Sequence, residues 1–199
     1  WSSDVCSSDL GSSFNHRNVS CLLRRSLQNP RVWRWKPEES ETRILEPEKW
    51  LDAWIFGLNH TPFDLLLPFA GWDSSYDASG RVSGRPAHLY VFRPRENERS
   101  RGSVVSIRLA IDNAYHAPLR IEMMDGGILP ARTLSLQSFK QIDEHWVVKA
   151  IDARDRDSSS RTRMEIVEAA HSLDLPSLIF EPVGLGMPLP LDSIEFLSL

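Results

Sequence analysis

The clearest structural pattern of the chain lies in residues 103–124, which read SVVSIRLAIDNAYHAPLRIEMM. Apolar side chains alternate with polar or small ones in two runs, 105–111 and 119–123, and such alternation is typical of β-strands that bury one face. Residues 113–117 separate the runs, so we expect a β-hairpin with one apolar and one charged face. A two-stranded ribbon is not stable alone, and other strands must extend it into a sheet.

The register of this hairpin follows from its charges. Pairing Ile111 with Leu119 keeps both apolar sets on one face and places Arg108 opposite Glu122. A slip by two residues would place Arg108 opposite Arg120, and like charges directly opposed are unfavourable. We therefore expect the first register, with the charged pair on the face away from the core.

The composition fits one globular domain. The chain has 199 residues, of which 41% are hydrophobic and 25% are charged. These values are typical of globular domains rather than of disordered chains or membrane-spanning segments. The formal net charge of -4 gives no sign of the basic face that nucleic-acid binding requires. We therefore expect a single domain over residues 11–183 and no nucleic-acid partner.

The two ends of the chain are interpreted separately from this domain. Residues 1–10 read WSSDVCSSDL, in which Ser-Ser-Asp occurs twice, and this segment resembles a translated sequencing adapter. We interpret it as a non-native artefact and exclude it from the fold. Because the chain starts at Trp1, we expect that the natural start, with any signal peptide, is missing. Residues 184–199 are predicted to form an extended C-terminal tail.

Two short helical segments are expected before the main sheet. Pro47 suits the first position of one helix, which Gly57 would end. The second helix covers residues 62–67, with Thr61 as N-cap and Asp64 at the acidic position of a capping box. The two segments carry large apolar side chains, with one more just beyond: Trp50, Trp54, Phe63, Leu66, Phe69 and Trp72. This cluster fits a helix pair that completes a core, and it also fits a movable cover over an apolar cavity.

Further strands are predicted on both sides of the hairpin. They cover residues 19–23, 31–36, 41–45, 85–92, 131–141, 145–153 and 161–168. With the hairpin they form an antiparallel meander of about seven to nine strands. In 131–141 the alternation is imperfect, because Phe139 falls on the face opposite Leu134 and Leu136, and this predicts a β-bulge.

No segment has the spacing that catalysis or metal binding usually needs. The six histidines are isolated, with no second histidine at helical spacing to share a metal. Residues 80–84, GRVSG, miss the nucleophile-elbow pattern by one position. Asp155 and Asp157 start like a calcium loop, but Ser160 stands where that loop requires glycine. We expect no catalytic residue, no metal site and no cofactor, and hence a protein that is not an enzyme.

Seven segments can be compared with a known family. They read DLLLPF at 64–69, GRPAHLYVF at 84–92, IRLAID at 107–112, PLRIEMMD at 118–125, SFKQIDEHWVVKAIDARD at 138–155, TRMEI at 162–166 and LPSLIFEP at 175–182. In order and spacing, they resemble the bacterial outer-membrane lipoprotein-sorting proteins, relatives of the carrier LolA. The resemblance covers about residues 31–183.

This resemblance implies a fold and a function. The fold would be mainly β with short helices, an antiparallel half-open β-barrel (LolA-like) with a helical lid, incomplete at the N-terminus. The protein would be a periplasmic, monomeric, non-catalytic carrier that holds acyl chains of lipoproteins, or a similar amphiphile, and exchanges them with membrane-bound donor or acceptor proteins. Four residues would line the cavity and five would form the lid: Ile107, Leu109, Leu119 and Ile121; Trp50, Trp54, Leu66, Phe69 and Trp72. The family carrier's lid-latching arginine lies toward the missing end, and the resemblance assigns it to no position of this chain.

Two alternatives to a carrier remain. A structural or interaction module of the same fold would fill its interior with its own side chains and use the charged loop 93–101 for a protein partner. A hydrolase using Asp112 and Glu122 is weaker, because Arg108 already balances Glu122 across the hairpin. The carrier hypothesis expects that Ile121→Glu lowers binding of an acyl probe while the strand signal is kept.

Overall fold

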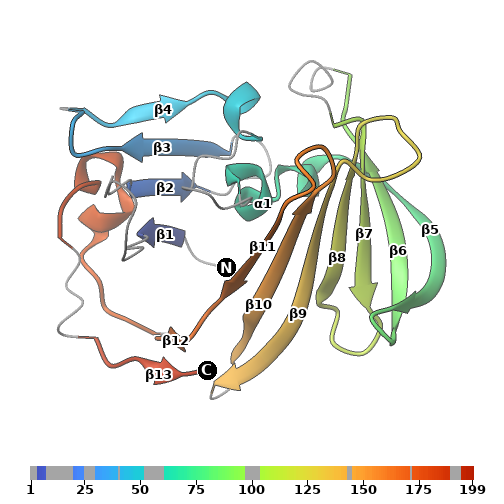
Figure 1. Cartoon of the computed structure of the whole chain (residues 1–199). Coiled ribbons are helices and arrows are strands. Elements are labelled where there is room, and N and C mark those ends of the chain that lie inside the picture. The colour runs from blue at the N-terminus through green and yellow to red at the C-terminus, as the bar shows by residue number, and fades with distance from the viewer. Residues whose placement is uncertain are drawn as a thin grey trace.

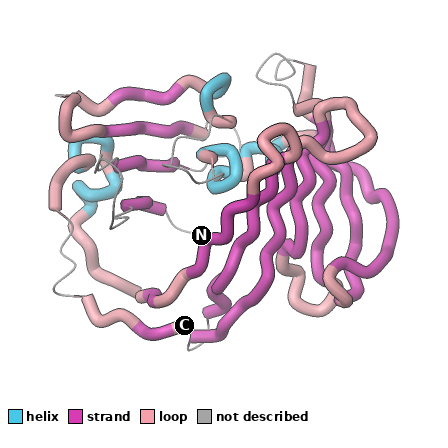
Figure 2. The backbone as a smooth tube through the Cα atoms, viewed as in Figure 1, coloured by secondary structure: helices cyan, strands magenta, loops and turns pink. Residues whose placement is uncertain are grey.

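The computed structural model describes residues 4–7, 20–24, 30–39, 41–51, 61–96, 104–142, 145–170, 172–188 and 194–199. In these residues the chain forms three antiparallel sheets, of seven, four and two strands (Figure 1). The short helices lie at the four-stranded sheet and between it and the seven-stranded sheet (Figure 2). The protein is therefore mainly β with few helices, as predicted.

The seven-stranded sheet is a meander in which each strand pairs with its sequence neighbour. Its strands are β5 (Asp73–Val82), β6 (Arg85–Arg93), β7 (Ser106–Asp112), β8 (Pro118–Met124), β9 (Arg132–Ile142), β10 (His145–Asp155) and β11 (Arg161–Glu165). β5 and β11 remain at the edges of the sheet, which is therefore open. The meander is confirmed, whereas the half-open barrel and its helical lid stay a prediction.

The central hairpin, β7 and β8, has the predicted loop over residues 113–117 and, for most of its length, the predicted register. Arg108 lies opposite Glu122, as expected. A bulge after Ala110 then shifts the ladder, so that Ile111 pairs with Pro118. The predicted pairing of Ile111 with Leu119 is therefore wrong. Leu119, the extra residue at the bulge, packs instead with Ala110 in a small separate cluster.

The four-stranded sheet contains β1 (Asp4–Ser7), β2 (Ser20–Arg24), β3 (Arg31–Trp35) and β4 (Arg43–Leu45), in that order. The strands predicted at 19–23, 31–36 and 41–45 are confirmed. β1 lies within the segment interpreted as an artefact, yet it pairs with β2 from Asp4 to Ser7.

The C-terminal segment returns to the main sheet. β12 (Glu168–Ala169) pairs with β13 (Leu197–Ser198), within the segment predicted to be a tail. Two lysines of the main sheet also hold this end, because Lys140 Nζ donates to the Ser198 carbonyl at 2.8 Å and Lys149 Nζ to the Leu199 carbonyl at 2.9 Å. The division of the chain into domain and tail stays a prediction.

The helices are short. α1 (Pro62–Leu66) follows the predicted capping box: the Thr61 amide donates to Asp64 Oδ2 at 2.8 Å, and the Asp64 amide donates to Thr61 Oγ1 at 3.4 Å. The helix predicted to begin at Pro47 is a single 3₁₀ turn, η1 (Pro47–Lys49), and residues 52–60 lie outside the described residues. The other 3₁₀ turns are η2 (Pro68–Gly71), η3 (Ser177–Phe180) and η4 (Pro182–Gly184). No helix in the described part of the chain has the length and apolarity to span a membrane.

The main core lies between the two larger sheets, with α1 at its centre (Figure 1). From the seven-stranded sheet it takes Ile107, Ile121, Met123, Leu134 and Ala153. We call the face that carries these residues the inner face. The opposite, outer face carries Arg108 and Glu122, because side chains alternate along a strand.

Candidate functional site

A buried ion pair fixes α1 to the inner face. Arg132, at the start of β9, donates from Nη2 to Asp64 Oδ2 at 2.6 Å and from Nε to Asp64 Oδ1 at 3.1 Å. The two side chains are only 8% and 2% exposed. Asp155 of β10 lies 3.9 Å from Arg132 Nη1 as a second carboxylate. Because a two-point contact between a guanidinium and a carboxylate fixes orientation as well as distance, α1 is held in one position on the sheet.

The predicted lid residues form an aromatic and aliphatic layer around α1. Trp50, Leu66 and Phe69 are buried, and Trp72 is partly buried. Trp54 lies outside the described residues. The structure thus brings four of the five predicted lid residues together in one cluster. Whether this layer moves as a lid stays a prediction.

Phe63, which follows the first residue of α1, joins this layer. Its ring centroid lies 6.4 Å from that of Phe69 and 6.3 Å from that of Trp72. Phe69 also contacts Phe92 of β6 edge-on, with 5.4 Å between the ring centroids. The layer is therefore continuous from α1 to the strands of the main sheet.

Three of the four predicted cavity residues lie under this layer. Ile107 and Ile121 are 0% and 3% exposed, and Leu109 packs against the same cluster while staying partly exposed. Leu119 is not with them, because the bulge in β8 places it in the separate cluster with Val82 and Ala87. The cavity-lining role of all four residues stays a prediction.

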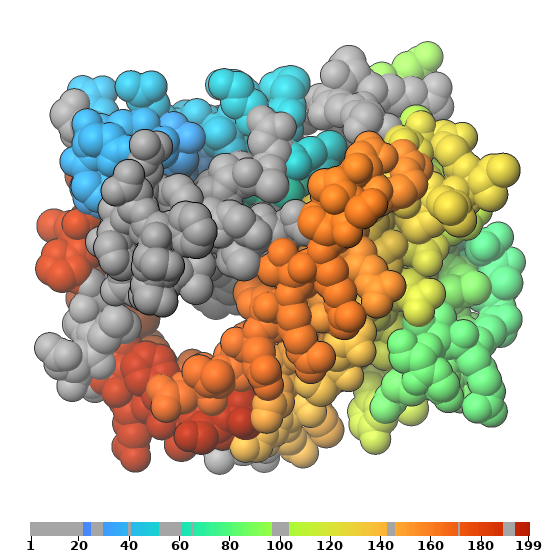
Figure 3. Space-filling view, in the orientation of Figure 1, coloured from blue at the N-terminus to red at the C-terminus, as the bar shows by residue number. Residues whose placement is uncertain are grey.

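The end of the inner face away from α1 carries apolar side chains that are only partly buried. Leu136, Ile151 and Met164 lie opposite one another across β9, β10 and β11, on the face of Leu134 and Ala153. Leu109 and Ile111 of β7 share this face and this partial exposure. We call these five residues the open strip: Leu109, Ile111, Leu136, Ile151 and Met164. An opening lies beside β11, which carries the last of them, and above β12 (Figure 3).

Next to the open strip, the inner face becomes polar and aromatic toward β5. Tyr90 pairs with Leu109 and His88 with Ile111, so both rings lie on the inner face. Ser79 hydrogen-bonds His88 Nδ1 at 3.1 Å and the Tyr76 hydroxyl at 2.8 Å. This end of the inner face is thus amphipathic. The open strip supplies its apolar part, and the polar side chains of β5 and β6 supply hydrogen-bonding groups.

The two carboxylates of the hydrolase hypothesis do not form a catalytic pair. Arg85 Nε donates to Asp112 Oδ2 at 2.5 Å, and this contact, with the Tyr115 amide, lowers the pKa of Asp112 to about 2. Such a carboxyl stays ionised at neutral pH and cannot act as a general acid. Glu122 makes its ion pair with Arg120, at 3.7 Å, and not with Arg108 as predicted, although Arg108 is its cross-strand neighbour. Within the described residues, no group of three or more His, Cys, Asp or Glu side chains is placed to hold a metal.

Solved structures of other proteins share this fold. A DUF1329 family protein from Desulfovibrio piger superposes with a TM-score of 0.71 at 16% identity, covering 84% of this chain and 70% of that chain. A putative outer membrane lipoprotein-sorting protein domain from Vibrio parahaemolyticus gives 0.69 at 14% identity, covering 81% and 68%. A LolA superfamily protein from Nitrosomonas europaea gives 0.54 at 13% identity, covering 91% and 87%. The protein has a LolA-like fold, and the predicted resemblance is confirmed at the level of fold.

Sequence comparison assigns the chain to a family. A family model whose description is "Uncharacterized protein" matches residues 72–186, more than half of the chain, and the chain belongs to that family. The matched region runs from Trp72, just before β5, through the seven-stranded sheet to η4. Among curated proteins, no sequence matches this chain.

Proposed function

We propose that this protein is a periplasmic, non-catalytic carrier that holds acyl chains of lipoproteins, or of a similar amphiphile, against the open strip. The observation that carries the proposal is the row of partly exposed aliphatic side chains on the inner face, centred on Ile151. The fold supports it, since one structure of the same fold is that of a putative outer membrane lipoprotein-sorting protein domain.

The open strip suits an acyl chain because apolar contact needs area rather than exact geometry. Shielding a methylene group from water contributes about 0.8 kcal/mol, so a chain of about 16 carbons gains on the order of ten kcal/mol when fully covered. The polar group of an amphiphile would lie at the β5 side of the strip, near Tyr76 and His88, where hydroxyl and imidazole groups face the same side. The carrier would work as a monomer and exchange its cargo with membrane-bound donor or acceptor proteins.

The test is binding of an environment-sensitive acyl probe to the purified protein. We expect binding by the wild type and at least about tenfold weaker binding by Ile151→Glu, since a charge on the strip would be desolvated by the probe. Val167→Glu is the matched control, because Val167 is 69% exposed and lies after β11, outside the strip. Circular dichroism should be the same for all three proteins.

Two results would overturn the carrier proposal. One is a folded wild-type protein that does not bind the probe, which would favour the interaction-module alternative. The other is equal binding by the wild type and Ile151→Glu. The variant suggested by the sequence, Ile121→Glu, is unsuitable, because Ile121 is 3% exposed and a buried charge there would disrupt the core.

A further inference from the structure

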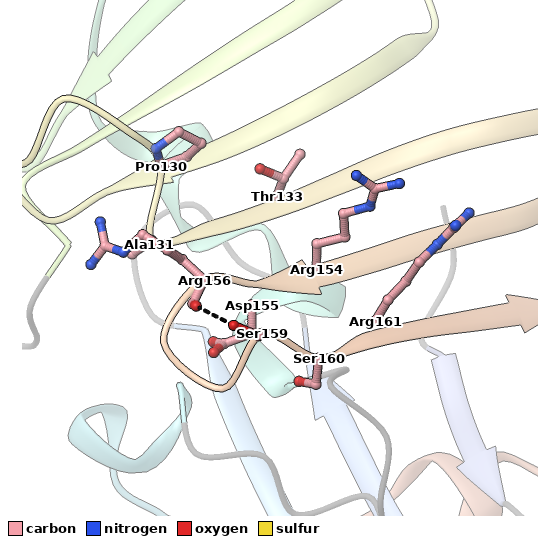
Figure 4. A pocket seen from close by; sticks show the side chains of 9 residues that line it. All are labelled: Pro130, Ala131, Thr133, Arg154, Asp155, Arg156, Ser159, Ser160 and Arg161. Atoms are coloured by element: carbon pink, nitrogen blue, oxygen red, sulfur yellow. Dashed lines mark hydrogen bonds between the residues drawn. The ribbon is translucent and has the colours of Figure 1, made fainter.

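Two arginines face each other directly on the outer face, at the turn end of β10 and β11. Arg154 and Arg161 are cross-strand partners, and in Figure 4 their side chains extend side by side from neighbouring strands. Like charges directly opposed in a sheet are unfavourable unless something balances them. Asp152 balances Arg161, with 2.6 Å between Oδ2 and Nη2, whereas no ion pair is found for Arg154 among the described residues.

These arginines line a pocket of about 390 Å³ that is otherwise rich in hydrogen-bond donors. Thr133, directly opposite Arg154 on β9, contributes a hydroxyl, whereas the Ser159 hydroxyl in the β10–β11 turn already donates to the Arg156 carbonyl at 3.5 Å. The pocket also contains one carboxylate, Asp155. Its charge is already engaged, because Oδ1 accepts from Ser158 and Oδ2 lies 3.9 Å from Arg132. Guanidinium and hydroxyl donors around one space are suited to phosphate groups.

The most exposed aliphatic side chain of the described residues lies two positions before the first residue that lines this pocket. Ile128 is 94% exposed and its neighbour Leu129 is 65% exposed. Both lie in the β8–β9 connection, at the same end of the sheet as the β10–β11 turn (Figure 1). The next two residues of this connection, Pro130 and Ala131, line the pocket itself. The apolar tip and the basic pocket are therefore parts of one surface.

Hydrogen bonds at both ends brace the loop that carries the two aliphatic residues. Arg156 donates from Nη2 to Asp125 Oδ2 at 2.6 Å and from Nη1 to the Leu129 carbonyl at 3.1 Å. The Gly127 amide donates to Asp125 Oδ1 at 3.1 Å, and the Ala131 amide donates to the Met123 carbonyl at 2.9 Å. Backbone groups that are already paired can enter an apolar layer without losing hydrogen bonds. The Leu129 carbonyl is thus already paired where the loop would contact a lipid phase.

We propose that this corner, formed by the β8–β9 connection and the β10–β11 turn, docks on an anionic phospholipid surface. Ile128 and Leu129 enter the apolar layer, while Arg154 and Arg161 contact lipid phosphates. A membrane surface is the partner that supplies both chemistries together, whereas a soluble phosphate would use the arginines and leave the aliphatic tip in water. This inference does not depend on the cargo site, which lies on the inner face.

The test is co-sedimentation of the full chain with vesicles of phosphatidylglycerol and phosphatidylethanolamine, compared with vesicles of phosphatidylcholine. We expect binding to the anionic vesicles that weakens in 0.5 M salt, since charges on a surface are screened. The double variant Ile128→Ser/Leu129→Ser should bind about tenfold more weakly, because buried apolar area sets the affinity of such contacts. Arg154→Gln should bind on the order of fivefold more weakly.

Matched controls separate the corner from general effects. Val167→Ser removes an aliphatic group elsewhere that is about as exposed as Leu129. Arg163→Gln removes an arginine of the same strand as Arg161 that does not line the pocket. Both should bind vesicles almost as the wild type does. Ile151→Glu should keep vesicle binding even where it loses the acyl probe, so the two proposals fail independently.

Three results would overturn the docking proposal. The first is no binding to anionic vesicles by the folded wild type. The second is equal loss in the corner variants and in their controls. The third is full displacement from vesicles by millimolar inorganic phosphate with no effect of the double serine variant, because the corner would then be a site for a soluble anion.

Discussion

The two ends of the inner face have the same strand pattern but different environments. Under α1, Ile107 and Ile121 are packed by aromatic rings and by the strands of the smaller sheet, and almost no surface remains exposed. At the other end, Ile151 and Met164 alternate with polar residues in the same way but stay partly exposed. We call these the capped end and the open end. The difference teaches that alternation makes a face apolar, whereas its cover decides whether that face becomes core or contact surface.

A polar interaction, in addition to apolar contact, determines where α1 lies on the capped end. Asp64 serves two partners at once, the Thr61 amide that begins α1 and the Arg132 guanidinium on the sheet. The same carboxylate therefore sets where the helix starts and where it sits. Within the described residues, no buried ion pair of this kind holds a helix on the open end. An amphiphile is the occupant that we propose there.

The largest expected effect comes from breaking the ion pair between Arg132 and Asp64. Arg132→Met should lower the free energy of unfolding by about 3–5 kcal/mol, because it leaves the Asp64 carboxylate buried without its partner. Urea unfolding followed by circular dichroism measures this loss. Arg24→Met is the control: Arg24 and Glu181 are 48% and 53% exposed, and such surface pairs contribute about 0–1 kcal/mol. Equal losses in the two variants would mean that α1 is not fixed by the ion pair.

A smaller effect should separate the two ends directly. Ile121→Ala at the capped end should cost about 2–5 kcal/mol, because a filled core cannot close the cavity that the substitution leaves. Ile151→Ala at the open end should cost about 1 kcal/mol, because part of that side chain is already in contact with water. Both values come from urea unfolding with the wild-type dependence on denaturant. If the two losses are equal, the open end is as well packed as the core, and the contrast between the ends is wrong.

Much of the fold was predictable because its signals are local. Alternation of apolar and polar residues predicted β7 and β8, and the spacing from Thr61 to Asp64 predicted the start of α1. Phe139, which breaks the alternation, predicted the irregular pairing of β9 with β10. β5 was missed, because its sequence DSSYDASGRV has almost no apolar alternation. An edge strand with mostly exposed side chains does not need an apolar face, and so it leaves little trace in the sequence.

The candidate site was predictable only in part, because it depends on contacts between distant segments. The sequence shows that Ile107 and Ile121 are apolar and share a face. It does not show that α1 covers them. The face of Leu119 depends on a bulge whose position no local pattern revealed. The partner of Asp64 is 68 residues further along the chain, and the sequence contains 19 arginines among which nothing local selects Arg132.

The smallest expected effect is a pH dependence on the outer face, behind the open end, where Arg85 pairs with Asp112, the residue after Ile111. In this pair Arg85 is 47% exposed, unlike the buried Arg132 of the capped end. Arg85, together with the Tyr115 and Ala114 amides, lowers the pKa of Asp112 from its ordinary value of 3.8 to about 2, and the Arg85 contact is the largest cause. A depressed pKa in the folded state stabilises the protein above the unfolded value, and this contribution is lost as pH falls through the folded value. The difference in unfolding free energy between the wild type and Arg85→Gln should therefore be constant above about pH 5 and should shrink between about pH 4 and 2.

Unfolding curves of the two proteins at several pH values measure this difference. Arg31→Gln is the control for loss of one positive charge, because Arg31 is exposed on β3 and has no ion pair within the described residues. Its difference from the wild type should change much less with pH in the same window. A parallel pH dependence in Arg85→Gln and Arg31→Gln would show that net charge, and not the Arg85 contact, governs the acid response.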